Sequence, residues 1–115
     1  MKKAENDEVF NFRQKAGGLT YKAFKKYKTL KSERTEKLLG CSFEFFHNHL
    51  LQTFKNTYGY EWDGIEPVHI DHIIPYATAK SVEDVIKLSH YTNTQLLKPI
   101  DNEKKGKKIN YKVKE

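Results

Sequence analysis

Residues 68–80, VHIDHIIPYATAK, decide what kind of fold this chain can form. His69, Asp71 and His72 interrupt an apolar run that otherwise has the composition of a strand interior. Burying such groups without partners is unfavourable, so each is either paired in the core or presented to a ligand. Adjacent side chains of a regular strand point to opposite faces, so Asp71 and His72 can face one ligand only at a bend or a strand end. Pro75 favours a strand end here.

Helical signals lie upstream of this strand. Residues 38–54, LLGCSFEFFHNHLLQTF, contain the N-cap serine Ser42 and a wide apolar stripe, which predict a core helix. Residues 20–37 form a basic stretch with aromatic residues at helical spacing. Two interpretations of it stay open: an ordinary helix with inward aromatics and solvated lysines, or a surface that follows phosphates. Residues 1–18 are polar and end in two glycines, so we expect a loosely held leader.

Downstream, short elements alternate. Ser81 predicts an N-capped helix to about residue 87, and residues 90–100, HYTNTQLLKPI, predict a second strand. Asp101 begins a helical turn or two that ends at Gly106. We therefore expect one domain over residues 19–115, with a helical, basic part at 19–57 and a mixed part at about 66–110.

Composition narrows the function. Of 115 residues, 21 are Lys or Arg and 15 are Asp or Glu, a formal charge of +6 that favours a polyanionic partner. No apolar run approaches the roughly 20 residues of a membrane span, and the N-terminus lacks the apolar core of a signal peptide. A single cysteine excludes an internal disulfide and a cysteine-rich zinc site. We expect a soluble, cytoplasmic protein that uses no membrane and no structural zinc.

Asp71, His72, Asn93 and Asn102 suggest phosphodiester chemistry. Hydrolysis of this bond needs a base that activates water and a cation that neutralises charge on the phosphate. A histidine has a reference pKa of about 6.5 and is largely neutral at physiological pH, so His72 suits the base. The carboxylate of Asp71 and the amide oxygen of Asn102 are ligand types suited to Mg²⁺.

Three ordered motifs carry a resemblance. HIDHIIP, HYTNTQLL and DNEKKGKK resemble the HNH endonucleases of the ββα-metal nuclease superfamily, in the zinc-free form of phage and homing enzymes. TEKLLGCSFEFF upstream is similar to the segment that precedes the catalytic motif, so the resemblance covers about residues 35–108. It implies an α+β fold, in which a ββα-metal core follows N-terminal helices.

The resemblance also implies roles. Asp71 would be the first metal ligand, His72 the general base, and Asn93 the residue that holds the loop between the strands. Asn102 matches the position where many members have a histidine ligand, and the cation would be Mg²⁺ or Mn²⁺. Lys105 matches a basic residue that commonly follows, and phosphate contacts would come from the lysines of this segment, Lys104, Lys105, Lys107 and Lys108.

Each residue also has a structural alternative. Asp71 could cap a turn, and His72 could be a hydrogen-bonded core histidine. Asn93 could bind local backbone, and Asn102 lies beside an aspartate that could cap the same helix. His69 could contact the metal, a phosphate or only a neighbouring residue.

The expected function is metal-dependent endonucleolytic hydrolysis of DNA, in the host cytoplasm if the chain is phage-encoded. So short a chain leaves little room for a recognition domain, so we expect low intrinsic specificity or a specificity-conferring protein partner. One site cuts one strand, and a double-strand break would need a homodimer or two visits. A non-catalytic nucleic-acid-binding module, or an accessory factor of a nuclease or packaging complex, remains an alternative. A protein-binding domain is a third, and it would lack the steep salt dependence of polyanion binding.

Overall fold

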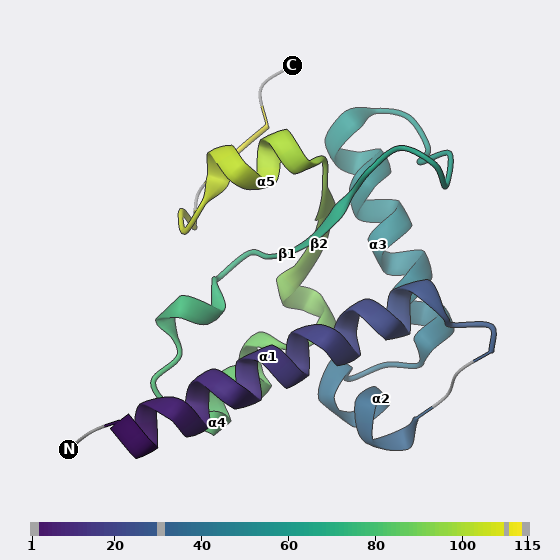
Figure 1. Cartoon of the computed structure of the whole chain (residues 1–115). Coiled ribbons are helices and arrows are strands. Elements are labelled where there is room, and N and C mark those ends of the chain that lie inside the picture. The colour runs from purple at the N-terminus through teal and green to yellow at the C-terminus, as the bar shows by residue number, and fades with distance from the viewer. Residues whose placement is uncertain (1–2, 30–31, 110, 114–115) are drawn as a thin grey trace.

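The computed structural model describes residues 3–29, 32–109 and 111–113. Figure 1 shows two short strands at the centre, with α5 on one side and α1 on the other. Helices combined with a small antiparallel sheet agree with the predicted α+β class. No helix in the described ranges is long and apolar enough to cross a bilayer. In chain order the elements are α1 (Lys3–Lys25), α2 (Glu33–Leu39), α3 (Phe43–Tyr58), β1 (His69–His72), the 3₁₀ turn η1 (Tyr76–Thr78), α4 (Val82–Leu88), the 3₁₀ turn η2 (Tyr91–Asn93), β2 (Thr94–Leu97) and α5 (Pro99–Lys105).

The first helix, α1, corrects the prediction of a loosely held leader over residues 1–18. Residues 1–2 lie outside the described ranges, and from Lys3 onward the segment belongs to one helix that runs through Gly17 and Gly18 without a break. A glycine in a helix interior costs about 1 kcal/mol relative to alanine. Packing overrides that cost, because α1 lies against α3 and α4 and buries side chains such as Phe24 in the core.

The basic aromatic stretch at residues 20–37 is divided between two helices. Its first residues form the end of α1 (to Lys25). Ser32 is the N-cap of α2, and its side chain accepts a hydrogen bond from a backbone N–H of that helix. Phe24 is buried, as the first interpretation expects, whereas Tyr21 is exposed. The first interpretation therefore does not hold for every aromatic residue of the stretch, and the phosphate-binding surface stays a prediction. Leu30, a further apolar position of this stretch, lies outside the described residues.

The third helix, α3, forms as predicted and supplies four of the eight buried residues in the hydrophobic core cluster of the described residues. The hydroxyl of Ser42 accepts a hydrogen bond from the backbone N–H of Phe45, and Gly59 ends the helix at a φ of 83°. A left-handed residue in this position is most easily a glycine. The predicted apolar stripe is buried along its length, at Phe43, Phe46, Leu50 and Phe54.

The sheet separates the side chains of β1 into two sets. β1 and β2 pair in antiparallel register, with His69 opposite Leu97 and His72 opposite Thr94. Ile70 and His72 project to the face that α1 and α3 cover, together with the core residue Leu96. His69 and Asp71 project to the other face, which α5 covers.

The segment after α4 differs from its prediction in two details. Residues 91–93 of the predicted strand form η2, which leaves only Thr94–Leu97 in the sheet. The last helix begins at Pro99 rather than Asp101, because proline has a φ suited to the first helical position and lacks the N–H that would be unpaired there. It ends before Gly106, as predicted.

Candidate active site

Asn93 connects the end of β1 to the segment that precedes β2. Its Oδ1 accepts a hydrogen bond from the backbone N–H of Ile74 (2.8 Å), and its Nδ2 donates to the carbonyl of Ile74 (3.0 Å) and to that of Leu88 (2.9 Å). The backbone N–H of Ile73 also donates to the Asn93 carbonyl (2.8 Å). Asn93 therefore fixes the chain directly after His72, at the place where the sequence analysis expected a loop-holding side chain.

His72 is the last residue of β1, and its ring lies on the face toward α1. The ring packs on Tyr76, with 4.1 Å between the ring centroids. Its Nε2 is buried, and none of the described residues provides a hydrogen-bond partner for it. Burial, and secondarily the charge of Lys105, lowers the pKa of His72 to about 4. The imidazole is therefore neutral at physiological pH and has an unpaired ring nitrogen.

Asp71 lies on the opposite face of β1 and is part of a buried ion pair. Its Oδ1 is 3.3 Å from Nζ of Lys105, and its Oδ2 accepts a hydrogen bond of 2.8 Å from Gln95. The side chains of Lys105 and Asp71 are only 1% and 7% exposed. Asp71 and His72 thus occupy a strand end, as expected, but they do not face the same space.

The ion pair corrects the prediction for Lys105. Its ammonium points into the protein, where it also donates to the carbonyl of His72 (3.3 Å), so it is not available to a phosphate on the surface. A buried ammonium needs a compensating charge, and Asp71 provides it. The other three predicted phosphate-binding lysines, Lys104, Lys107 and Lys108, are exposed.

Asn102 lies on α5, one helical turn before Lys105, and faces β1. Its Nδ2 donates to Nδ1 of His69 over 3.1 Å. Of the three alternatives for His69, the structure therefore shows contact with a neighbouring residue. His69, Asp71 and Asn102 share the space between β1 and α5, and Asn102 does not cap its helix because α5 begins at Pro99.

The chemistry of this face fits a hard divalent cation. Mg²⁺ normally takes one or two protein oxygen ligands and keeps several waters, and the carboxylate of Asp71 and the amide oxygen of Asn102 are ligands of that type. No group of three or more His, Cys, Asp and Glu side chains that could hold a metal occurs within the described part of the chain. A cation here would compete with the ammonium of Lys105 for Asp71.

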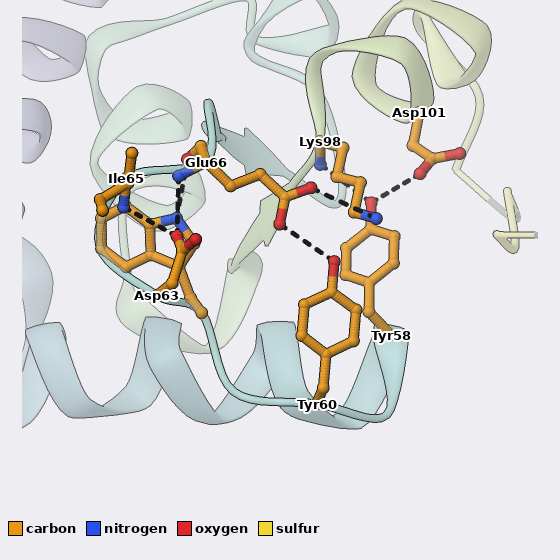
Figure 2. Close-up of polar contacts among 8 residues, drawn as sticks. Tyr58, Tyr60, Asp63, Ile65, Glu66, Lys98 and Asp101 are labelled. Atoms are coloured by element: carbon orange, nitrogen blue, oxygen red, sulfur yellow. Dashed lines mark hydrogen bonds and ion pairs between the residues drawn. The ribbon is translucent and has the colours of Figure 1, made fainter.

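A network from α3 fixes the beginning of α5, as Figure 2 shows. The hydroxyl of Tyr58 accepts a hydrogen bond from the backbone N–H of Lys98 (2.9 Å) and donates to the buried carboxylate of Asp101 (2.6 Å). The ammonium of Lys98 lies 4.6 Å from the centroid of the Tyr58 ring and 3.4 Å from a carboxylate oxygen of Glu66. Tyr58 thereby positions the helix that bears Asn102.

Removing this hydroxyl is expected to destabilise the protein. In Tyr58→Phe the backbone N–H of Lys98 and the carboxylate of Asp101 each lose a partner, which corresponds to a loss of about 1–3 kcal/mol in the free energy of unfolding. Urea unfolding monitored by circular dichroism measures this loss. Tyr60→Phe is the matched control, because that hydroxyl contacts Glu66 at the surface and is worth well under about 1 kcal/mol. Equal midpoints for the two variants would contradict the positioning role.

A pocket of about 490 Å³ opens between α1 and β1. His69, His72 and Asn102 line one wall. The other wall is a face of α1, and its part before residue 18 was not predicted, because residues 1–18 were expected to be a leader. The signal was present in the spacing of three or four between the α1 residues that line the pocket, Phe10, Arg13, Gln14, Gly17, Thr20, Tyr21, Phe24 and Lys25.

The structure thus places the predicted residues in two adjoining spaces. His72 lies in the pocket, Asp71 lies beneath α5, and His69 and Asn102 border both. Asn93 supports the turn after His72 without lining the pocket. Comparison of the chain with protein-family models, with curated proteins and with solved structures finds no match.

Proposed function

We propose that this protein is a metal-dependent DNA endonuclease that hydrolyses phosphodiester bonds, with His72 as the general base. One observation carries the proposal: Nε2 of His72 is buried in the wall of a pocket, belongs to a neutral imidazole and has no partner among the described residues. A buried polar atom left without a partner is unfavourable and needs an explanation. A substrate water that donates to Nε2 is such an explanation.

In the proposed reaction Nε2 of His72 accepts a proton from a water whose oxygen attacks the phosphorus. The phosphorus–oxygen bond to the 3′ oxygen breaks, and this oxygen leaves and takes a proton from solvent. The phosphate anion near the ring raises the pKa of the imidazole, which helps a base that is weak in the free protein. Asn93 keeps the ring in place through its bonds to Ile74. Asp71 and Asn102 would hold a divalent cation, and because Asn102 also lines the pocket of His72, the cation would supply positive charge to the phosphate there.

The ion pair of Asp71 favours a second candidate. Both carboxylate oxygens are engaged, one by Lys105 and one by Gln95, on the face away from His72. A chain that retains this arrangement when it binds nucleic acid would be a binding module without turnover. The exposed lysines Lys104, Lys107 and Lys108 would serve either function through salt-dependent contacts to phosphates.

Cleavage of supercoiled plasmid separates the two candidates. The wild-type protein is incubated with DNA in Mg²⁺, Mn²⁺ or EDTA, beside His72→Ala and the control His90→Ala, whose imidazole lies outside the pocket. Gel shifts in EDTA measure DNA binding by all three proteins. The nuclease predicts nicked or linear DNA only with metal, and loss of cutting but not of binding in His72→Ala. Binding by all three proteins without cutting by any would support the binding module.

A further inference from the structure

The α1 wall of the pocket combines exposed aromatic rings with cations. Phe10 and Tyr21 are 47% and 56% exposed although both are large and apolar. They lie on one face of α1, eleven residues apart, or about 16 Å along the helix at 1.5 Å per residue. Exposed rings on one face of a binding groove are what unpaired bases stack on, and at this separation Phe10 and Tyr21 would hold two bases of one strand that are not adjacent.

A cation accompanies each of these rings. The guanidinium carbon of Arg13 lies 5.4 Å from the centroid of the Phe10 ring, and the ammonium of Lys25 lies 5.9 Å from that of Tyr21. Both cations line the pocket, and no aspartate or glutamate is among the described residues that line it. The wall therefore offers stacking surfaces and phosphate-binding charges in alternation, as proteins that bind single strands do.

The burial of His72 in the pocket favours single-stranded over double-stranded DNA as the substrate. Nε2 of His72 is buried beneath the ring of Tyr76, so an attacked phosphate must enter the space between α1 and β1. A duplex is stiff over about 150 base pairs, and its bases are stacked inside it, out of reach of Phe10 and Tyr21. A single strand is flexible and exposes both its backbone and the faces of its bases.

We infer that the pocket takes single-stranded DNA, held between α1 and β1, with bases on Phe10 and Tyr21 and phosphates on Arg13 and Lys25. As far as cleavage at His72 is concerned, this inference rests on the proposed function. The binding of single-stranded DNA does not depend on it. Unpaired segments in bulges, gaps or locally opened duplexes would be the substrate class.

Fluorescence anisotropy in EDTA tests binding apart from cleavage. We expect a labelled 12-nucleotide single strand to bind at least about 10-fold more tightly than the blunt duplex of the same sequence, with a gapped duplex close to the single strand. Tyr21→Ala should weaken single-strand binding about 5-fold or more, because one stacked base is lost. Phe45→Ala is the matched control, since Phe45 is an equally exposed ring outside the pocket.

Gly17→Leu tests the pocket itself. A Cβ added at Gly17 meets no atom within 4 Å, and Gly17 lines the pocket, so a larger side chain at this position begins in open space and occupies part of the pocket. We expect weaker single-strand binding together with a higher melting temperature, because leucine is a better helix former than glycine. Equal affinity for the duplex and the single strand, or unchanged binding in both Gly17→Leu and Tyr21→Ala, would overturn the inference.

Cleavage assays in Mg²⁺ keep the two proposals distinguishable. Selective binding of the single strand without cutting of any DNA would support the pocket assignment and remove the nuclease. Cutting of duplex DNA without preference for the single strand would support the nuclease and remove the pocket assignment. Metal-dependent cutting that is confined to unpaired segments would support both.

Discussion

Lys105→Met is expected to lower the free energy of unfolding by about 3–5 kcal/mol. The ammonium of Lys105 is the charge partner of the buried carboxylate of Asp71, and removing one member of a buried ion pair leaves the other uncompensated. The carbonyl of His72 loses a hydrogen-bond donor in the same variant. Methionine has a similar length and fits an apolar space, so the loss reports charge rather than volume. Urea unfolding at pH 7 in EDTA measures it.

Two further variants isolate the ion pair. Lys104→Met removes an exposed lysine from the same helical turn and should change the stability by less than about 0.5 kcal/mol. The double variant Asp71→Leu/Lys105→Met removes both charges and should recover most of the loss, because apolar replacement of a whole buried pair is often neutral. A Lys105→Met protein within about 1 kcal/mol of the wild type would show that the pair contributes little.

The Lys105→Met variant also tests whether a divalent cation binds at Asp71. If Asp71 and Asn102 bind a divalent cation, it competes with Lys105 in the wild type and has no competitor in Lys105→Met. Mn²⁺ should therefore raise the melting temperature of the variant more than that of the wild type, since a ligand stabilises the state that it binds. An equal shift in both proteins would argue against a cation at Asp71.

His72 is expected to make the protein unstable in mild acid. Its pKa is about 4 in the folded protein and about 6.5 in the unfolded chain, so the unfolded chain binds the proton more readily. The stability is complete above about pH 6.5 and falls as the pH drops toward 4, by roughly 3 kcal/mol for this group. Urea unfolding at pH 7.5 and 4.5, in the wild type and in His72→Phe, measures the contribution. The variant should lose less stability in acid, and an equal loss would contradict the assignment.

The same low pKa shapes the expected activity. Cleavage at subsaturating concentrations reports the free protein, whose imidazole is already unprotonated at pH 5, so this rate should stay level between pH 5 and 8, where an ordinary histidine would lose activity below about pH 6.5. Removal of the base in His72→Ala should lower the rate about 10²- to 10⁴-fold at pH 7. Single-turnover cleavage over this pH range measures both effects. A rate that falls with a midpoint near pH 6.5 would indicate a base exposed to solvent.

The elements that could be predicted from the sequence are those with complete local signals. Ser42 with the phenylalanine stripe defines α3, and Ser81 defines α4, because each combines a cap with an apolar face. β1 was located by its apolar run and the following proline. The part of α1 before residue 19 was missed because Gly17 and Gly18 indicate a break locally, whereas the packing that holds the helix together comes from residues far away in the chain.

The sequence predicted which residues gather at the candidate site, but not the directions in which their side chains point. The motif residues do gather around β1 and α5, yet the alternation of strand side chains places Asp71 and His72 on opposite faces. The inward direction of Lys105 depends on how α5 lies across β1, which no local pattern encodes. The same holds for Tyr58, whose partner Asp101 is 43 residues away in the sequence.

Helix α1 also determines which part of the chain could be moved to another protein as one structural unit. The residues that carry the nuclease resemblance fall within about 35–108, but Ala23 and Phe24 of α1 belong to the same hydrophobic core. A fragment that begins at residue 35 would lose part of that core and one wall of the pocket together. Transfer of the motif residues alone to another protein would therefore leave out part of their scaffold, so the transferable unit includes α1.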